Sequence, residues 1–227
     1  MSENVSLKVI AHIRNDYKSK FGIPRQSGIV GSLQSEIVFE REFKNPDCIR
    51  GIEGYSHLWL IWQFSKSSGG TNAPTVRPPK LGGNTRVGVF ASRSPFRPNP
   101  IGLSSVKLIK TDITADGPVI YVGGADLADG TPILDIKPYI PYTDSHPDAQ
   151  SGFALTPDHT TEVVIAPELS RKIPERLKKP LTEILSQDPR PGYQNDPDRI
   201  YKMRLGDYDI GFSVSGGTAT VLSAEKI

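Results

Sequence analysis

The stretch HLWLIWQF, residues 57–64, is an apolar and aromatic run with the length of one buried strand. β-branched or aromatic runs of similar length, bounded by Gly, Pro or Asn, occur at residues 7–13, 35–42, 85–91, 103–109, 119–124 and 133–139. A series of short strands with few helices between them is typical of a barrel or a sandwich. The sequence therefore predicts a mainly β fold for the first two thirds of the chain.

The pattern changes after residue 144. Residues 145–161 have the composition of a connector, and apolar residues near helical spacing follow within residues 174–187, where Pro180 is expected to start or kink a helix. Three strand-like runs, residues 201–205, 208–214 and 218–225, are separated by the turn pairs Gly206-Asp207 and Gly216-Gly217. We predict two domains: a β domain over residues 1–145 and a smaller α+β domain over residues 146–227.

Composition describes a soluble globular chain: 227 residues, 37% hydrophobic, 23% charged, with 21 Gly and 20 Pro. A single cysteine, Cys48, rules out an internal disulfide and indicates a reducing compartment, and we expect it to be a half-buried structural thiol. A short helix is expected to start at Asn45 as N-cap, with Pro46 at its first position. No apolar run of about 18 residues is present. We therefore expect a cytoplasmic protein without a membrane segment.

Charge is distributed asymmetrically along the chain. No acidic residue occurs between Glu53 and Asp112, whereas the interval contains Lys66, Arg77, Lys80, Arg86, Arg93, Arg97, Lys107 and Lys110. The next segment, up to Asp148, is acidic and contains one basic residue, Lys137. A local basic surface of this kind favours a polyanion, most often nucleic acid. The alternative is an ordinary solvated face, particularly for the lysines taken singly.

The basic interval includes a rigid loop, SRSPFRPNPIGLSSVKL, at residues 92–108. Each proline fixes its own φ and restricts the residue before it, so Arg93, Arg97 and Asn99 have little entropy left to lose on binding. The alternative is a proline-rich connector whose arginines are simply solvated.

Common cofactor and catalytic motifs are missing from the sequence. The four histidines are not at metal-ligand spacing, and the chain contains no G-x-G-x-x-G after a strand, no Walker loop and no G-x-S-x-G elbow. We expect no metal, and we expect His57 to be a hydrogen-bonded core residue. A small-molecule site must be built from other segments.

Two short segments have suitable chemistry. Arg25, in Pro24-Arg25-Gln26, could bind a carboxylate or phosphate, or form a structural salt bridge. Asp135 and Lys137 are two residues apart and hence on one face of a strand, where opposite charges tune each other's pKa. That pair is either part of a reaction centre or a buried structural pair.

Four segments, PRQ, GYSHLWLIWQF, VGVFASRSPFRPNPIGLSSVKL and DLADGTPILDIKPYIPYTD, resemble the signature motifs of the TsaA-like, TrmO family of tRNA methyltransferases. The resemblance spans most of residues 5–145. It implies a non-Rossmann β-barrel that binds S-adenosylmethionine and methylates the exocyclic nitrogen of threonylcarbamoyladenosine at tRNA position 37, next to the anticodon. It also implies a homodimer. The alternatives are a noncatalytic RNA-binding β-barrel and, less well supported, a hydrolase acting through Asp129 and Asp135.

The resemblance implies cofactor contacts at the family's motif positions: Pro24, Arg25, Gln26, Phe64, Ser65, Arg93, Leu103, Asp129, Gly130, Thr131 and Pro132. Because methylation removes a proton from the nitrogen, we predict Asp135 as its acceptor, with Lys137 stabilising developing charge or steering the threonyl carboxylate. For the tRNA phosphates we predict Arg77, Arg86 and Arg97.

Overall fold

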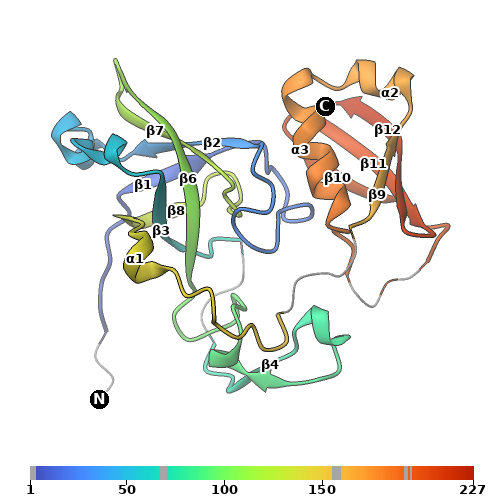
Figure 1. Ribbon diagram of the computed structural model, residues 1–227, viewed down its shortest axis with the longest axis horizontal. Helices are drawn as coiled ribbons and strands as arrows, with labels where there is room; N and C mark the ends of the chain where they lie inside the picture. Colours follow the sequence, from blue (N-terminus) through green and yellow to red (C-terminus); the bar gives the residue numbers. More distant parts are fainter. Residues whose placement is uncertain (1–3, 67–70, 155–159, 192–193, 195) are drawn as a thin grey trace.

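The strand-like runs of the first half close into a barrel (Figure 1). The computed structural model describes residues 4–66, 71–154, 160–191, 194 and 196–227. Antiparallel pairing gives the closed order β1-β2-β7-β6-β3-β8. The barrel strands are β1 (Ala11–Arg14), β2 (Gln34–Phe39), β3 (His57–Gln63), β6 (Ile101–Thr114), β7 (Gly117–Gly123) and β8 (Pro132–Pro138). The predicted non-Rossmann β-barrel is confirmed.

Alternation along β3 separates the barrel interior from its outer face. Leu58 and Leu60 are fully buried and Trp62 nearly so, whereas Trp59 and Ile61 are only partly covered. Trp62 lies opposite Gly102 of β6, and a Cβ added at Gly102 would lie 2.2 Å from Trp62 Cε2. A glycine is therefore required there, because the indole ring occupies the space of its missing side chain.

The predicted strand at residues 85–91 is mostly wrong. Only β5 (Val87–Gly88) is extended; it pairs with β4 (Thr75–Val76) in a two-stranded ribbon outside the barrel, and a 3₁₀ turn, Val89–Ala91, follows. A second 3₁₀ turn, Pro79–Leu81, lies between β4 and β5. Val89 N–H donates to Pro74 O at 3.0 Å, a bond that ties the 3₁₀ turn to the residue before β4.

Two further predictions in this half need correction. Cys48 is exposed, because the predicted helix is a 3₁₀ turn, Pro46–Ile49, that buries only Ile49. Its cap is nevertheless as expected, since the Asn45 side chain accepts from Asp47 N–H at 3.0 Å. His57 is partly exposed, bonded to Ser56 Oγ and in edge contact with Tyr139, and is not a core residue. Two more 3₁₀ turns, Arg41–Phe43 and Ile52–Gly54, flank the same region.

The second half forms a four-stranded sheet of order β10-β11-β12-β9, covered by helices (Figure 1). Its strands are β10 (Tyr201–Leu205), β11 (Tyr208–Ser215), β12 (Thr218–Lys226) and β9 (Glu162–Ile165), and its helices are α2 (Pro167–Lys172) and α3 (Glu175–Ser186). Three strands were predicted; β9, which pairs in parallel with β12 and directly follows the predicted connector, was missed. The α3 helix continues through Pro180, which is buried. A one-turn helix, α1 (Pro141–Asp144), follows β8.

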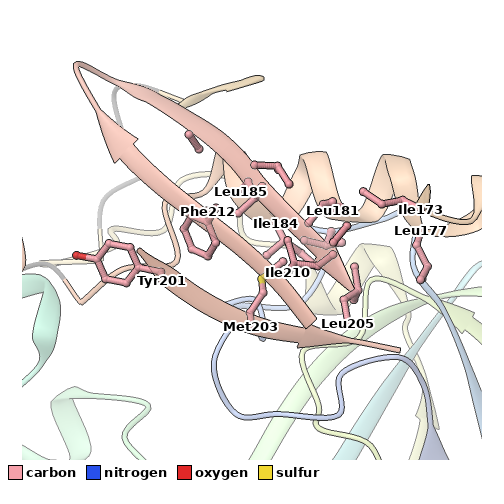
Figure 2. Close-up of a cluster of buried hydrophobic side chains, with 14 of the residues drawn as sticks. Ile173, Leu177, Leu181, Ile184, Leu185, Tyr201, Met203, Leu205, Ile210 and Phe212 are labelled. Atoms are coloured by element: carbon pink, nitrogen blue, oxygen red, sulfur yellow. The ribbon is translucent and has the colours of Figure 1, made fainter. Parts of the chain in front are cut away.

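The barrel interior has its own hydrophobic cluster, and a second, shared core joins a loop of the first half to the second half. Helix α3 packs Leu177, Leu181, Ile184 and Leu185 onto β10 and β11, as Figure 2 shows. The same cluster includes residues of the loop between β1 and β2, namely Tyr17, Phe21, Ile23, Val30 and Leu33. This β1–β2 loop, residues 15–33, therefore belongs to the first half by sequence and to the second half by packing.

Candidate functional site

The β1–β2 loop is fastened at its base to the loop that joins β7 to β8, residues 124–131. Asn15 donates its side-chain amide to Leu127 O at 2.9 Å and its N–H to Asp129 Oδ1 at 2.9 Å. Gly28 N–H donates to Gly124 O at 2.8 Å. The predicted cofactor segments at residues 24–26 and 129–132 are thus brought to the same end of the barrel.

The Asp129-Gly130-Thr131-Pro132 turn is rigid. Gly130 has φ +77°, a left-handed conformation that favours glycine, and its N–H donates to Ile13 O at 2.8 Å. Thr131 is 2% exposed, its N–H donates to Ala128 O at 3.1 Å and its carbonyl accepts from Ile13 N–H at 3.1 Å, so it supports the turn from the interior.

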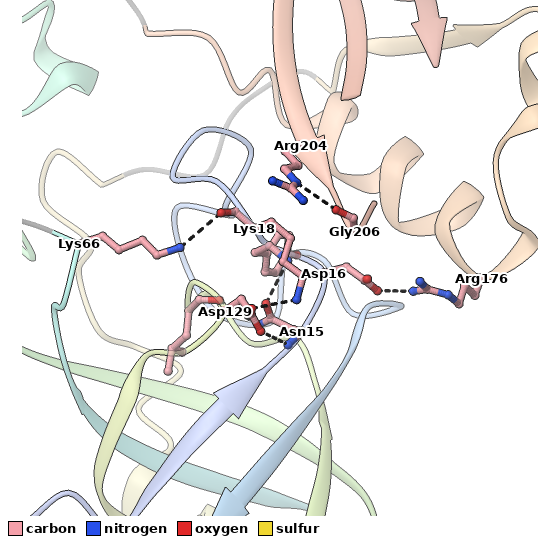
Figure 3. A network of polar contacts seen from close by, with 10 residues as sticks. Asn15, Asp16, Lys18, Lys66, Asp129, Arg176, Arg204 and Gly206 are labelled. Atoms are coloured by element: carbon pink, nitrogen blue, oxygen red, sulfur yellow. Dashed lines mark hydrogen bonds and ion pairs between the residues drawn. The ribbon is translucent and has the colours of Figure 1, made fainter. Parts of the chain in front are cut away.

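The Asp129 carboxylate is engaged by Lys18 Nζ at 2.8 Å, next to the Asp16–Arg176 ion pair (Figure 3). Sequence reasoning missed Lys18, whose side chain is about one third exposed. A cavity of about 560 Å³ adjoins this network and is lined in part by Asn15, Asp16 and Lys18.

The Pro24-Arg25-Gln26 segment links three parts of the molecule. Arg25 Nη2 donates to Arg190 O at 2.8 Å and to Asp188 O at 3.4 Å, in the turn after α3. Gln26 Oε1 accepts from Arg93 Nη1, which brings the proline-rich loop to the same place. Arg25 therefore binds backbone carbonyls of the second half, and among the residues that the structure describes it has no salt-bridge partner.

The carbonyls that Arg25 uses are themselves fixed. Asp188 has φ +43°, a strained conformation for a residue other than glycine. Arg190 forms two hydrogen bonds of 2.8 Å to the Asp188 carboxylate. These bonds lower the pKa of Asp188 against the opposing effect of its burial. The second half thus holds the Arg25 side chain in place.

The end of β3 joins the same cluster. Phe64 N–H donates to Pro100 O at 2.9 Å, and its ring meets Trp62 edge-on with centroids 4.4 Å apart. Ser65 is exposed, and Lys66 Nζ reaches Lys18 O at 3.4 Å. The end of β3 that carries Phe64 and Ser65 therefore lies beside the β1–β2 loop.

One carboxylate at this end was not assigned a role by sequence reasoning. Asp126 accepts from Ser104 Oγ at 2.5 Å, and Ser104 accepts from the Trp62 indole at 2.9 Å. Burial raises the pKa of Asp126, opposed by the Ser104 hydrogen bond and by the positive charge of Arg93. The sequence indicated Asp126 only by its position three residues before Asp129, and a segment of this kind is also typical of an ordinary turn.

The remaining predicted residues of the reaction centre lie on the outer face of the barrel. Asp135 and Lys137 form an ion pair of 2.8 Å with side chains 45% and 61% exposed, so the alternative of a buried structural pair is wrong. Leu103 is 57% exposed, and in the barrel register both Leu103 and Asp135 pair with Ile61. Asp135, Lys137 and Leu103 therefore share one outer surface. Among the described residues, no hydrogen bond links this surface to the residues gathered around the β1–β2 loop.

The predicted phosphate ligands lie on or beside the β4–β5 ribbon. Arg77 and Arg86 are exposed, and Arg86 Nη1 donates to Thr75 Oγ1 at 2.9 Å. Arg97 is partly buried and donates to Ser92 O at 3.1 Å, so it also closes the proline-rich loop on itself. Within the described residues no group of three or more His, Cys, Asp or Glu could hold a metal ion, and no helix there is long and apolar enough to cross a membrane.

Comparison with known proteins matches both halves of the chain. The family described as the tRNA-methyltransferase O N-terminal domain matches residues 12–145, and the TrmO C-terminal domain matches residues 159–227. A tRNA (adenine(37)-N6)-methyltransferase of Escherichia coli is 40% identical over 225 residues, covering 95% of this chain and 96% of the relative. One of the same name from Eikenella corrodens is 46% identical over 168 residues, 74% of this chain and 95% of the relative.

Comparison with solved structures finds the same fold over the whole chain. The crystal structure of TrmO from Pseudomonas aeruginosa superposes with a TM-score of 0.82 and 30% identity, covering 100% of this chain and 99% of the other.

Proposed function

This chain belongs to the TrmO family of tRNA methyltransferases, and from that premise we propose that it methylates the exocyclic nitrogen of threonylcarbamoyladenosine at position 37 of tRNA. The activity is that of an S-adenosylmethionine-dependent tRNA (adenine37-N6)-methyltransferase. The observation that carries the proposal is the convergence of residues 24–26, Phe64, Arg93 and residues 126–131 at one end of the barrel.

The groups gathered there fit S-adenosylmethionine. A guanidinium has five N–H donors, and the hydrogen bonds described for Arg25 and Arg93 use one nitrogen of each, which leaves donors for a carboxylate. Phe64 offers an aromatic surface for adenine, and the carboxylate oxygens of Asp126 suit the positive charge of a sulfonium. Pro24, Gln26, Ser65 and the Asp129–Pro132 turn complete the proposed cofactor contacts at this end of the barrel, and Leu103 would contact the cofactor on the outer face.

When bound, the cofactor supplies a methyl group on a positively charged sulfur. The chain must orient the acceptor nitrogen in line with that methyl and receive its proton. We assign the proton to Asp135 and the stabilisation of negative charge to Lys137. Their partial exposure supports this, because a tRNA base can reach them without rearrangement of the barrel. Because the acceptor nitrogen must lie beside both the methyl group and Asp135, the bound cofactor would have to extend from the β1–β2 loop to the outer face that carries Leu103 and Asp135.

Nucleoside mass spectrometry tests the activity directly. The protein and S-adenosylmethionine are incubated with tRNA that carries the threonylcarbamoyl group and with the same tRNA lacking it; methylation confined to the first is expected. Calorimetry with S-adenosylmethionine alone separates this function from a noncatalytic RNA-binding barrel. Absence of cofactor binding would refute the enzymatic proposal.

The assignment of Asp135 has its own test. Asp135→Asn should retain cofactor affinity, measured by calorimetry, and lose turnover by roughly 100-fold or more, the usual contribution of a general base. A matched control is Asp209→Asn. Asp209 forms a second Lys–Asp ion pair, with Lys202 in the C-terminal sheet, and removing its charge should leave turnover unchanged. Unchanged turnover in Asp135→Asn would contradict the assignment.

Three features extend the proposal. The chain acts on tRNA through phosphate contacts from Arg77, Arg86 and Arg97, supported by the absence of acidic residues between Glu53 and Asp112. It forms a homodimer, supported by exposed Ile101 and Leu103 on the outer face of the barrel. Its domains divide at residues 145 and 146, supported by the change from barrel to connector, and it functions in the cytoplasm.

A further inference from the structure

Phe90 is the most exposed phenylalanine among the described residues, with 81% of its surface accessible. Its backbone is fixed on both sides, because Val89 N–H donates to Pro74 O at 3.0 Å and Ser92 Oγ donates to Val89 O at 3.0 Å. Val89 itself is 4% exposed and anchors the turn. The backbone therefore holds the Phe90 ring in solvent. Covering this apolar ring with a ligand would be favourable, because it removes apolar surface from water.

The surroundings of Phe90 are basic. Arg86 precedes it and Arg93 follows it in the chain, and both are exposed. The next loop residues repeat the pattern, since Phe96 is 47% exposed and directly precedes Arg97. The whole interval between Glu53 and Asp112 lacks an acidic residue. Aromatic rings interleaved with arginines are suited to single-stranded RNA, in which bases stack on rings and phosphates meet cations.

Resting on the proposed function, we propose that Phe90 stacks on an unpaired base of the tRNA anticodon loop and thereby helps to present nucleotide 37 to the barrel. A methyltransferase must take its target base out of the stack, and a neighbouring base that stacks on protein compensates for the lost contact. The arginines on both sides position the backbone, and the ring supplies affinity that does not depend on charge.

This division of labour predicts two different salt dependences. Removing a phosphate contact reduces the slope of log affinity against log salt, whereas removing a stacking ring weakens binding by a similar factor at every salt concentration. Phe90→Ala should weaken binding about 5- to 150-fold, the range expected for the loss of one base–aromatic stack. Phe90→Trp should restore it, because the larger ring also stacks.

The experiment is fluorescence anisotropy of labelled, threonylcarbamoyl-modified tRNA with the full chain across a salt series. Ile113→Ala removes another exposed apolar side chain, 56% accessible and near the end of β6, and should leave affinity unchanged. Arg77→Gln provides the comparison for a changed slope. Light scattering of each variant reports its oligomeric state, and circular dichroism reports its folding.

Weaker binding of Phe90→Ala at all salt concentrations, with recovery in Phe90→Trp, is the expected result. Unchanged affinity would overturn the proposal, and so would a loss that coincides with a change of oligomeric state, since the ring would then belong to a subunit contact. Because binding is measured directly, this test does not depend on methylation: a wild-type protein that binds this tRNA without methylating it would count against the proposed function and not against the stack.

Discussion

Substitution of Gly102 by alanine tests the packing that ties the barrel interior to the site. A Cβ at Gly102 would lie 2.2 Å from Trp62 Cε2, 2.4 Å from Cζ2 and 2.7 Å from Cδ2. Ordinary carbon contacts are about 3.5–4.0 Å, so the indole must move by more than about 1 Å. Trp62 is 6% exposed and hydrogen-bonded to Ser104 Oγ, which leaves it little room to move. Overpacking costs about 1–3 kcal/mol and the weakened hydrogen bond about 1 kcal/mol, so we expect Gly102→Ala to lose about 2–4 kcal/mol of unfolding free energy.

The assay is urea unfolding followed by fluorescence and circular dichroism. Gly54→Ala is the matched control, because nothing lies within 4 Å of its added Cβ and its φ is not in the left-handed region. Its stability should be unchanged or slightly higher. A second variant, Trp62→Leu, should lower the unfolding free energy less in the Gly102→Ala background than in the wild type, because removing the indole also relieves its clash with the new Cβ. The reasoning is refuted if Gly102→Ala stays within about 0.5 kcal/mol of wild type, the usual range for harmless surface changes.

Two further perturbations have clear directions. Leu181→Ala removes a fully buried side chain of α3 from the shared core and should cost about 2–5 kcal/mol in urea unfolding; a loss under about 1 kcal/mol would mean that the core closes around the gap. Burial raises the pKa of Asp126, so the native state holds that proton more tightly than the unfolded chain. Stability should therefore fall as pH rises from the ordinary carboxyl range through the raised native pKa, and Asp126→Asn should flatten this fall in pH-dependent unfolding while keeping the Ser104 hydrogen bond; an unchanged slope would point to another group.

The sequence predicted the barrel strands best where the signal is local. The run at residues 57–64 has one long apolar stretch, and the observed β3 coincides with it to within one residue. Residues 85–91 are also rich in β-branched and aromatic residues but form only a short ribbon strand and a turn, where Val87 and Gly88 pair with β4 and Val89 N–H donates to Pro74 O. The strand β9 was missed because its four residues pair in parallel with β12, a partner more than 50 residues away. Such pairing leaves no periodic signal in so short a segment.

The candidate site shows a similar limit. Motif segments identified Arg25, Gln26 and Arg93, and the structure brings them together. Spacing alone could not place Asp135 on the outer face, and it could not show that Arg25 is held by carbonyls of the turn after α3. These relations depend on contacts between distant parts of the chain: Arg25 and the two carbonyls that it binds are separated by 163 and 165 residues.

The shared core also affects the order in which segments of this protein can fold during synthesis. The barrel strands leave the ribosome first, but Tyr17 and Phe21 of the β1–β2 loop pack on residues of β10, β11 and β12. The close approach of Gly22 to Met203 and the bond from Gly206 N–H to Asp16 O at 2.7 Å add to that dependence. The loop that carries Arg25 therefore gains its native packing only when β10, β11 and β12 have been synthesised. Until then a nascent chain can pair its barrel strands while the β1–β2 loop lacks the surface on which it packs.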